Sequence, residues 1–437
     1  MSFSIRPNLN VYEGFYCSER EYIRAVSAIF FGENMMKNKF GLIIAFGLLA
    51  AASSAQAAAG RGAVQRADMA QKRHNLTFSE IGDDYADFKN RLNKDYGFSY
   101  ALDISYMPQR AAPNGRKTAW QTMIYPSFSW TSFDNGYGTG TLNFAYNIVR
   151  YGGSAATRLE NNIGVVTGIN DYDSKSTSFD ELYYSYQLPG EADWLTVALG
   201  QFPLYNFDGT NYDSNQQVNF INYALSQNAS STYSTAGFGS FVQIAPNSSW
   251  SFAFGAQDAE NIDGVSIRLN DLDKKHFTSF VYAAYTPSIS GLGASDVSIL
   301  LYNQPGVKAQ PETTNGWSLN LSQNIGEKLS LFGRINGVSG SVAEIRRSWV
   351  AGGVYNNPLD RNPLDQIGLA FAYNELDEKA VGSRLNHNSE KVIEAYWAWG
   401  ISKWATITPD VQFYIHPAQN PKSDYGTAFS LRATLFF

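Results

Sequence analysis

Cysteine is nearly missing from this 437-residue sequence: Cys17 is the only one, which excludes an intramolecular disulfide framework. Charged residues are scarce too, at 16%, whereas an average soluble domain has about a quarter. The net charge of −6 has the wrong sign for a surface that binds phosphate backbones. We therefore expect no disulfide-stabilised scaffold and no nucleic-acid partner.

Long apolar runs are also missing after residue 57, so no transmembrane helix is expected in the rest of the chain. Aromatic side chains are abundant instead, with 28 Phe, 27 Tyr and 9 Trp making up 15% of the residues. The mean hydropathy of −0.27 suits a soluble protein. It equally suits membrane strands that alternate between lipid-facing and water-facing side chains, because the two sets average out.

Residues 36–57 contain the three parts of a secretory signal peptide in order. A basic start, an apolar stretch and a small-x-small cleavage site follow one another: Met36, Lys37 and Lys39, then residues 40–52, then Ala55 and Ala57. We predict a cleaved signal and export. Because other residues precede this signal, we also expect translation to start at Met35 or Met36, which makes residues 1–35 a wrongly assigned extension.

Residues 58–96 are expected to form an N-terminal segment with one short amphipathic helix. Four apolar side chains recur at helical spacing in it: Ile81, Tyr85, Phe88 and Leu92. After Tyr96 the apolar period changes from 3.6 to 2, which is the period of β-strands. This period continues to the last residue.

Seventeen segments between residues 97 and 437 look like strands of about ten residues, the length that crosses a bilayer at a tilt. Short links alternate with longer connectors, as in outer-membrane barrels; the short ones are residues 131–137, 189–193, 247–248, 287–294, 325–327, 356–364 and 401–405. If residues 159–170 formed a strand, every later short link would change sides. We therefore assign that segment to a long loop, residues 150–177, and predict sixteen strands, with eighteen as the alternative.

The alternating faces indicate which solvent surrounds the strands. In the last strand Phe429, Leu431 and Leu435 share one side, while Ser430, Arg432 and Thr434 share the other. A soluble sandwich would bury such polar side chains in a dry core, at about 1–3 kcal/mol for each unpaired group. A closed, antiparallel transmembrane β-barrel avoids this cost, and sixteen strands leave a water-filled channel. We predict this all-β fold for residues 97–437.

Three stretches resemble the carbohydrate-selective porins of the OprB type: residues 181–215, 352–373 and 394–421. They contain a Leu-Pro-Gly turn, a Pro-Leu-x-Arg turn and a Thr-Pro-Asp-x-Gln signature, and this chain has Gly200-Gln201 where the family pattern is Gly-Lys. The resemblance implies a sixteen-stranded, monomeric channel that passes small sugars by facilitated diffusion. It also implies the outer membrane of a Gram-negative bacterium, with lipid and lipopolysaccharide as neighbours. Phe437 resembles the terminal aromatic residue that the barrel-insertion machinery reads.

The longest connector, residues 204–235, is the candidate constriction of such a channel, because a sugar site needs aromatic faces and hydrogen-bonding groups. Its candidate residues are Tyr205, Asn206, Phe207, Asp208, Tyr212, Asp213, Asn219, Phe220 and Tyr223. A loop that packs only over the barrel mouth is the alternative. The candidates for the lumen wall are Asp103, Glu181, Arg334, Glu394, Asp410, Gln412, Tyr414 and Arg432. Arg346, Arg347 and Arg361 fall in connectors, where solvent or lipid head groups are the expected neighbours.

An outer-membrane enzyme is the rival class, and it would need a nucleophile, a base and an orienting group. The sequence has four histidines, no G-x-S-x-G motif and no metal-ligand spacing. Asp180 and Glu181 are adjacent carboxylates, but neighbours on a regular strand point to opposite faces, so we do not expect them to act together. We predict no enzyme, metal or cofactor. A general porin for other small polar solutes remains the nearer alternative.

Overall fold

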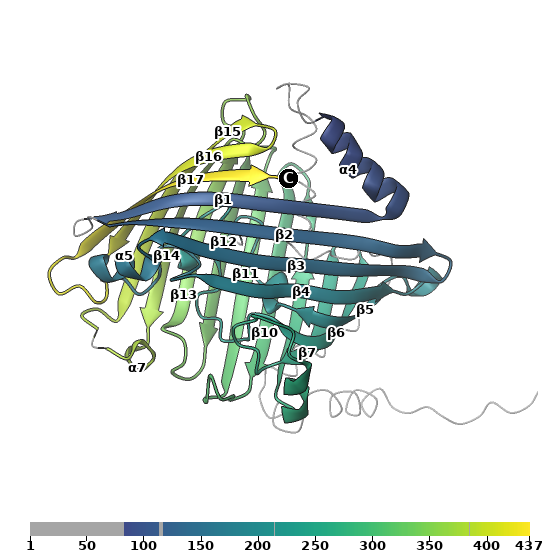
Figure 1. Cartoon of the computed structure of the whole chain (residues 1–437), viewed down its shortest axis with the longest axis horizontal. Helices are drawn as coiled ribbons and strands as arrows, with labels where there is room; N and C mark the ends of the chain where they lie inside the picture. Colours follow the sequence, from purple (N-terminus) through teal and green to yellow (C-terminus); the bar gives the residue numbers. More distant parts are fainter. Residues whose placement is uncertain (1–82, 113–116, 214, 384) are drawn as a thin grey trace, which may run out of the picture. The chain divides into compact units, whose positions relative to one another are not determined.

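The computed structural model of the chain describes residues 83–112, 117–213, 215–383 and 385–437 (Figure 1). The predicted extension (1–35), the signal peptide (36–57) and its cleavage residues Ala55 and Ala57 lie outside them. No helix within the described ranges is long and apolar enough to span a bilayer.

Strands dominate the described residues. The strands are β1 (Phe98–Ala112), β2 (Thr118–Asn135), β3 (Gly138–Gly153), β4 (Ser176–Gln187), β5 (Leu195–Phe202), β6 (Gly237–Asn247), β7 (Trp250–Asp258), β8 (Phe277–Tyr285), β9 (Ser288–Ile289), β10 (Gly293–Gln304), β11 (Thr314–Ile325), β12 (Leu329–Val338), β13 (Ile345–Asn356), β14 (Gln366–Leu376), β15 (Ser389–Ser402), β16 (Ala405–Ile415) and β17 (Tyr425–Phe436). The helices are α4 (Asp83–Tyr96), α5 (Ala156–Ile163), α6 (Tyr223–Ser226) and α7 (Glu378–Val381), with 3-10 turns η1 (Gly190–Ala192), η2 (Leu204–Phe207) and η3 (Leu269–Lys274).

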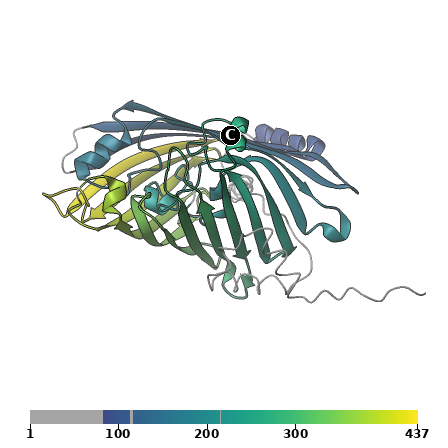
Figure 2. The same cartoon turned by 90° about the horizontal axis from the view of Figure 1, so that it is seen from below.

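The strands close into one antiparallel barrel. Each strand pairs with the next along the chain, β8 pairs with β10, and β17 returns to pair with β1, where Ile104 lies opposite Leu435. Figures 1 and 2 show the yellow C-terminal strands beside the dark-blue first strands. The two-residue β9 extends only the hairpin before β10. Sixteen strands therefore form the barrel wall, as predicted, and the eighteen-strand alternative is wrong.

The connectors alternate between the two ends of the barrel as the sequence predicts. One end has the seven short turns, at residues 136–137, 188–194, 248–249, 286–292, 326–328, 357–365 and 403–404. The other end, where β1 ends and β2 begins, has the connectors 154–175, 203–236, 259–276, 305–313, 339–344, 377–388 and 416–424. By the convention of outer-membrane barrels, the short turns mark the periplasmic end and the second set marks the extracellular end. Residues 159–170 form no strand, in agreement with their assignment to a loop.

The alternation of faces is regular over most of the wall. In β17 the side chain of Phe429 is 52% exposed, whereas Arg432, three residues further along the strand and on the opposite face, is 1% exposed. The strands β16 and β15, which follow β17 around the barrel, also have exposed apolar residues on their outer faces, for example Phe413 and Trp397. The inner face is polar and covered by inserted loops. The backbone of Phe437 exchanges both hydrogen bonds with Leu102, which completes the closure.

The predicted N-terminal helix is confirmed as α4. It packs on the barrel at the periplasmic end, where the hydroxyl of Tyr100 in β1 donates to the hydroxyl of Tyr85 at 2.9 Å. The ring of Tyr85 also meets Trp404 edge-on, with centroids 5.5 Å apart. Gly97 follows the helix at φ 66°, a conformation that favours glycine, and its carbonyl accepts from Thr131.

Candidate permeation pathway inside the barrel

The 203–236 loop enters the barrel, and Arg334 of β12 is one of its two arginine anchors. Its Nη1 donates to Oδ2 of Asp213 at 2.8 Å, and its Nη2 donates to the Ala224 carbonyl at 2.8 Å. Both charged side chains of this ion pair are fully buried. Asp213 also accepts from Thr210 through the backbone N–H and the hydroxyl. The pair therefore fixes one segment of the loop against the inner wall.

Arg432 of β17 is the second anchor. Its guanidinium donates to the carbonyls of Gln216, Val218 and Asn219, which form one turn of the loop. The neighbouring Thr434 donates to the Gln217 carbonyl at 2.9 Å. Both predicted wall arginines thus point inward, and both bind the loop rather than each other.

Glu394, one of three acidic wall residues near the loop, holds the loop through the loop's backbone amide groups. Glu394 of β15 accepts from the backbone N–H of Ile221 at 2.6 Å and of Asn222 at 2.8 Å. The inward-facing Asp410 of β16 lies beside Glu394. The Nε2 of Gln217 reaches the Asp103 carbonyl of β1 at 3.3 Å. All three predicted acids are buried on the inner face.

Two predicted aromatic residues of this loop are not free to stack on a solute. Phe207 lies among the wall aromatics Phe241 and Phe280, with ring centroids 5.3 Å and 4.9 Å away. Phe220 packs between Phe332 and Tyr396 at 5.5 Å and 4.9 Å. Both rings are buried, which contradicts the expectation that they offer sugar-stacking faces. They fasten the loop through apolar contact instead.

The other predicted loop residues make polar contacts. Asp208 accepts from Asn228 and from Asn320 of β11, and Tyr212 accepts from Ser330 of β12. Asn219 donates to the Asn211 carbonyl within the loop. Tyr223 begins the short helix α6, which Asn222 caps by accepting from the Ala224 N–H.

A β-bulge corrects the predicted orientation of Asp180 and Glu181. The register of β4 against β3 shifts where Ala145 pairs with Glu181 and Tyr146 pairs with Phe179, so Asp180 is the extra residue. As a result both adjacent carboxylates are buried on the inner face. Glu181 accepts from Asn206 of the loop at 2.8 Å.

Tyrosine hydroxyls surround this carboxylate pair. Tyr205 and Tyr125 lie next to Asp180, and their own hydroxyl oxygens are 3.4 Å apart. One oxygen of Asp180 has no hydrogen-bond partner. The bulge thus produces a paired carboxylate site where the loop leaves the wall.

The 154–175 loop also enters the barrel, which the sequence interpretation did not foresee. Glu390 of β15 accepts from the backbone N–H groups of Val166, Thr167 and Ala418. The predicted wall residues Gln412 and Tyr414 donate to the carbonyls of Ile169 and Gly168, at 3.0 and 2.7 Å. These contacts hold the loop on the β15–β16 side of the lumen.

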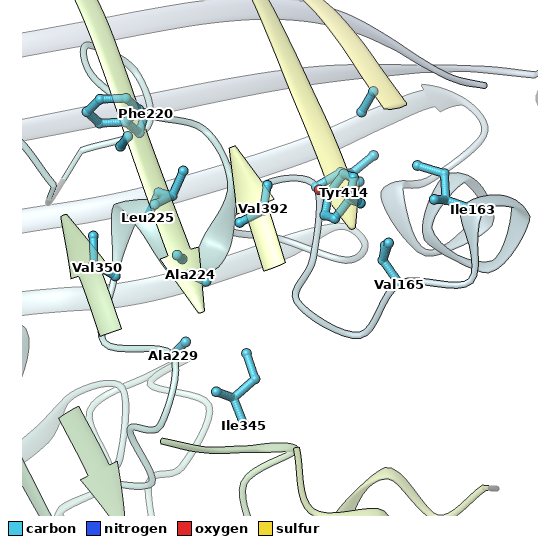
Figure 3. Close-up of a cluster of buried hydrophobic side chains, with 14 of the residues drawn as sticks. Ile163, Val165, Phe220, Ala224, Leu225, Ala229, Ile345, Val350, Val392 and Tyr414 are labelled. Atoms are coloured by element: carbon cyan, nitrogen blue, oxygen red, sulfur yellow. The ribbon is translucent and has the colours of Figure 1, made fainter. Parts of the chain in front are cut away.

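The two loops join each other through polar and apolar contacts. Asn222 donates to the Gly168 carbonyl at 2.6 Å, and Ser226 donates to Asp171. Figure 3 shows Ile163 and Val165 of one loop and Phe220 and Leu225 of the other in the same buried apolar cluster. The loops therefore form one continuous inserted body.

Burial changes the acidity of carboxyl groups in the 154–175 loop. The pKa of Glu160 is raised to about 8, first because burial disfavours its charged form and second because Asp173 lies nearby. Burial likewise raises the pKa of Asp171 to about 7, against the opposing effect of the hydrogen bond from Ser226. Both groups are therefore neutral at mildly acidic pH.

One signal in the sequence could have revealed this second loop. The signal is the spacing of Leu159 and Ile163, two apolar residues one helical turn apart. Both are buried on the same face of the short helix α5. Gly164 ends it at φ 83°, where an added Cβ would lie 2.8 Å from the backbone of Asn420.

Within the described residues, no group of three or more His, Cys, Asp or Glu is placed to hold a metal ion.

Comparison with known proteins identifies the family. A family model described as carbohydrate-selective porin, OprB family, matches residues 276–437. Porin AaxA of Chlamydia pneumoniae is 40% identical over 346 residues, which cover 77% of this chain and 78% of the relative. The chain belongs to the OprB family of porins. Porin AaxA of Chlamydia abortus is 36% identical over 353 residues, which cover 79% of this chain and 78% of that relative.

Solved structures agree with the porin fold. The high-pH structure of Pseudomonas putida OprB is similar with a TM-score of 0.66 at 14% identity, covering 81% of this chain and 97% of that one. OmpF of Salmonella typhi, solved with daunomycin, is similar with a TM-score of 0.52 at 11% identity, covering 78% and 97%. This OprB-family chain is therefore a channel protein of the outer membrane of Gram-negative bacteria.

Proposed function

We propose that this porin passes small carbohydrates by facilitated diffusion, and that the 154–175 and 203–236 loops together form its constriction. The observation that carries the proposal is the anchoring of both loops to the inner wall. Arg334, Arg432 and Glu394 contact one loop, and Glu390 contacts the other, through buried, charge-assisted hydrogen bonds. Loops held in this way narrow the lumen rather than lie over its mouth.

The chemistry of the inner face supports a sugar as the permeant. Carbohydrate hydroxyl groups both donate and accept hydrogen bonds, so they need amides, hydroxyls and carboxylates along their path. The inner wall is built from such groups: Gln121 of β2 and Gln412 and Tyr414 of β16 bind the inserted 154–175 loop. Tyr125 and Tyr205 lie beside the carboxylate of Asp180 at the β4 bulge. The matching family model carries the description carbohydrate-selective, which points to the same class.

A second candidate is a porin for small solutes with positive charge. The buried ionisable side chains among the described residues are eleven acids and only three bases; Glu160, whose pKa is raised to about 8, is neutral at pH 7, and the other ten acids still outnumber the bases. Two of those bases, Arg334 and Arg432, already bind loop groups. An excess of fixed negative charge in a narrow passage favours cations over anions.

Liposome swelling with neutral sugars, sugar acids and amino acids of equal size distinguishes these candidates. The carbohydrate proposal expects neutral sugars to enter faster than the charged solutes. Equal rates for all solutes would reduce the protein to a general porin, and faster entry of cations would favour the second candidate.

Single-channel conductance tests the constriction. Deleting residues 211–228 should raise the conductance several-fold, because the passage widens. The matched control removes only η3, which lies in the 259–276 connector and itself has no buried residues. This deletion should leave the conductance unchanged. An unaltered conductance in the first variant would reject the constriction.

A further inference from the structure

A second β-bulge places two arginines on the outer surface of the barrel. The register of β13 against β14 shifts between Ile345, which pairs with Leu376, and Arg347, which pairs with Glu375, so Arg346 is the extra residue. In a regular strand these neighbours would point to opposite faces. Here the side chains of Arg346 and Arg347 are 48% and 54% exposed, and both face Glu375 on the outside.

These arginines lie at the level of the outer-leaflet head groups. They begin β13 at the extracellular end of the barrel, directly after the 339–344 connector. Trp349 and Tyr373 form an outward aromatic pair just below them, with ring centroids 5.4 Å apart. Because Trp and Tyr gather at membrane–water interfaces, this pair marks the boundary of the hydrocarbon layer. Arg347 is two residues beyond Trp349, which is roughly 7 Å along a strand.

A lysine completes the basic group. Lys391 of β15 pairs with Tyr373, and its Nζ lies 5.9 Å from the centre of that ring. The facing residue on the other side is Gly337 of β12, which has no side chain to cover Arg347. Three cations and one acid, Glu375, therefore share this outer surface.

The guanidinium groups keep their donors available. Glu375 is 3.6 Å from Arg346 and 3.7 Å from Arg347, which exceeds the length of a good hydrogen bond. Arg150, another cation on the outer wall, differs in this respect, because its Nη1 donates to the Val149 and Ser176 carbonyls and to Thr177. Planar guanidinium forks with unused donors match the oxygen atoms of a phosphate group.

We propose that Arg346, Arg347 and Lys391 form a binding site for a phosphate group of lipid A, the anchor of lipopolysaccharide in the outer leaflet. The two bulged arginines grip the phosphate and Lys391 adds a point charge. The acyl chains lie below, along the apolar outer faces of β13–β15. The site fixes the porin to its surrounding lipid and is independent of the solute that passes through the lumen.

Binding of bisphosphorylated lipid A in mixed micelles to the immobilised, full mature protein tests this proposal. The double variant R346Q/R347Q should bind about tenfold more weakly or worse, because two charge-assisted contacts are lost. The R346K/R347K variant should bind with an affinity between those of the wild type and R346Q/R347Q, since lysine keeps the positive charge but loses the paired donors of the guanidinium group. The matched control R150Q should bind like the wild type, because Nη1 of Arg150 is already bound to the barrel wall and Arg150, unlike the arginines of the β13 bulge, has no second arginine next to it in the chain.

Several results would overturn the site. Equal affinity of R346Q/R347Q and wild type for bisphosphorylated lipid A is one of them. A difference in affinity between the wild type and R346Q/R347Q that persists with dephosphorylated lipid A is another, because the phosphate would then be irrelevant. Competition by inorganic phosphate at the concentration of the lipid would show a free-anion site instead. Folding of each variant is checked by its heat-modifiable gel mobility. The affinity of the wild type and of R150Q must fall as salt rises, and the affinity of R346Q/R347Q should depend less on salt.

Discussion

At the scale of single residues, the buried charges of the barrel wall are compensated by loop backbone groups. Arg432 binds three carbonyls, and Glu394 binds two N–H groups. A charge without such partners would be costly inside the barrel, because a buried unpaired ion pays its full desolvation. These residues therefore determine where the 203–236 loop lies as much as they add to stability.

The Arg334–Asp213 pair gives the first prediction at this scale. Asp213→Asn or Arg334→Met alone should lower the free energy of unfolding by about 3–5 kcal/mol, because each leaves a buried charge without its partner. The double variant should lose less than the sum of the two. Urea unfolding of the protein in lipid vesicles measures all three values.

The exposed pair of Lys328 and Asp360 is the matched control. Their side chains are 34% and 71% exposed, so solvent screens their attraction. Lys328→Gln should change the free energy of unfolding by less than about 1 kcal/mol. Additive losses in the Arg334 and Asp213 double variant would contradict the direct coupling.

At the scale of elements, the alternation of apolar and polar side chains predicts the strands, but it does not predict the two β-bulges. The outward positions Phe429, Phe413 and Trp397 follow from a period of two that local sequence contains. The bulges at Asp180 and Arg346 depend on how each strand registers with its partner, which no local pattern records. Both bulges re-aim a charged side chain, one into the lumen and one toward the membrane.

The inserted loops show the same limit. The length of the 203–236 connector predicted an unusual loop, and its arginine partners were predicted to face inward. Which loop group each would bind depends on contacts between residues far apart, such as Arg432 and Gln216. The entry of the 154–175 loop rests on Glu390, whose role no spacing in the sequence indicated.

A pH dependence of the 154–175 loop is the prediction at this scale. Glu160 has an ordinary pKa of 4.5 that burial raises to about 8, and for Asp171 the change is from 3.8 to about 7. The inserted loop therefore binds more protons than a displaced one between these values. The stability contributed by these protons is fully present below about pH 4, and it is lost progressively as pH rises to about 7 for Asp171 and about 8 for Glu160.

Single-channel conductance should thus rise between about pH 4 and pH 8 as the loop loosens, and should change no further above that range. Glu160→Gln cannot ionise, so it should shift this transition or remove its upper part. Glu191→Gln changes an exposed acid in the periplasmic turn and should leave the transition in place. Conductance that stays constant across this range would show that the loop remains inserted when its acids ionise.

At the scale of the whole molecule, the barrel separates three environments by residue type. Apolar and aromatic side chains face lipid, a basic group faces the outer-leaflet head groups, and acids dominate the interior. The acidic interior follows from the wall positions and from both loops together, so the net charge of the chain alone would not predict its extent. Ions that cross the barrel experience this distribution directly.

Ion selectivity is therefore the prediction for the whole molecule. In a potassium chloride gradient, the reversal potential should show a preference for cations, because buried acids outnumber buried bases. The double variant D180N/E181Q removes the carboxylate pair at the β4 bulge and should reduce the cation-to-anion permeability ratio by about twofold. Asp360→Asn, at an exposed periplasmic turn, should leave the ratio unchanged.

The preference for cations should weaken toward 1 M salt, where the screening length falls to about 3 Å, because fixed charges then act only on ions that touch them. An anion preference, or a ratio indifferent to the β4 variant, would mean that the buried acids are neutral or shielded from the ion path.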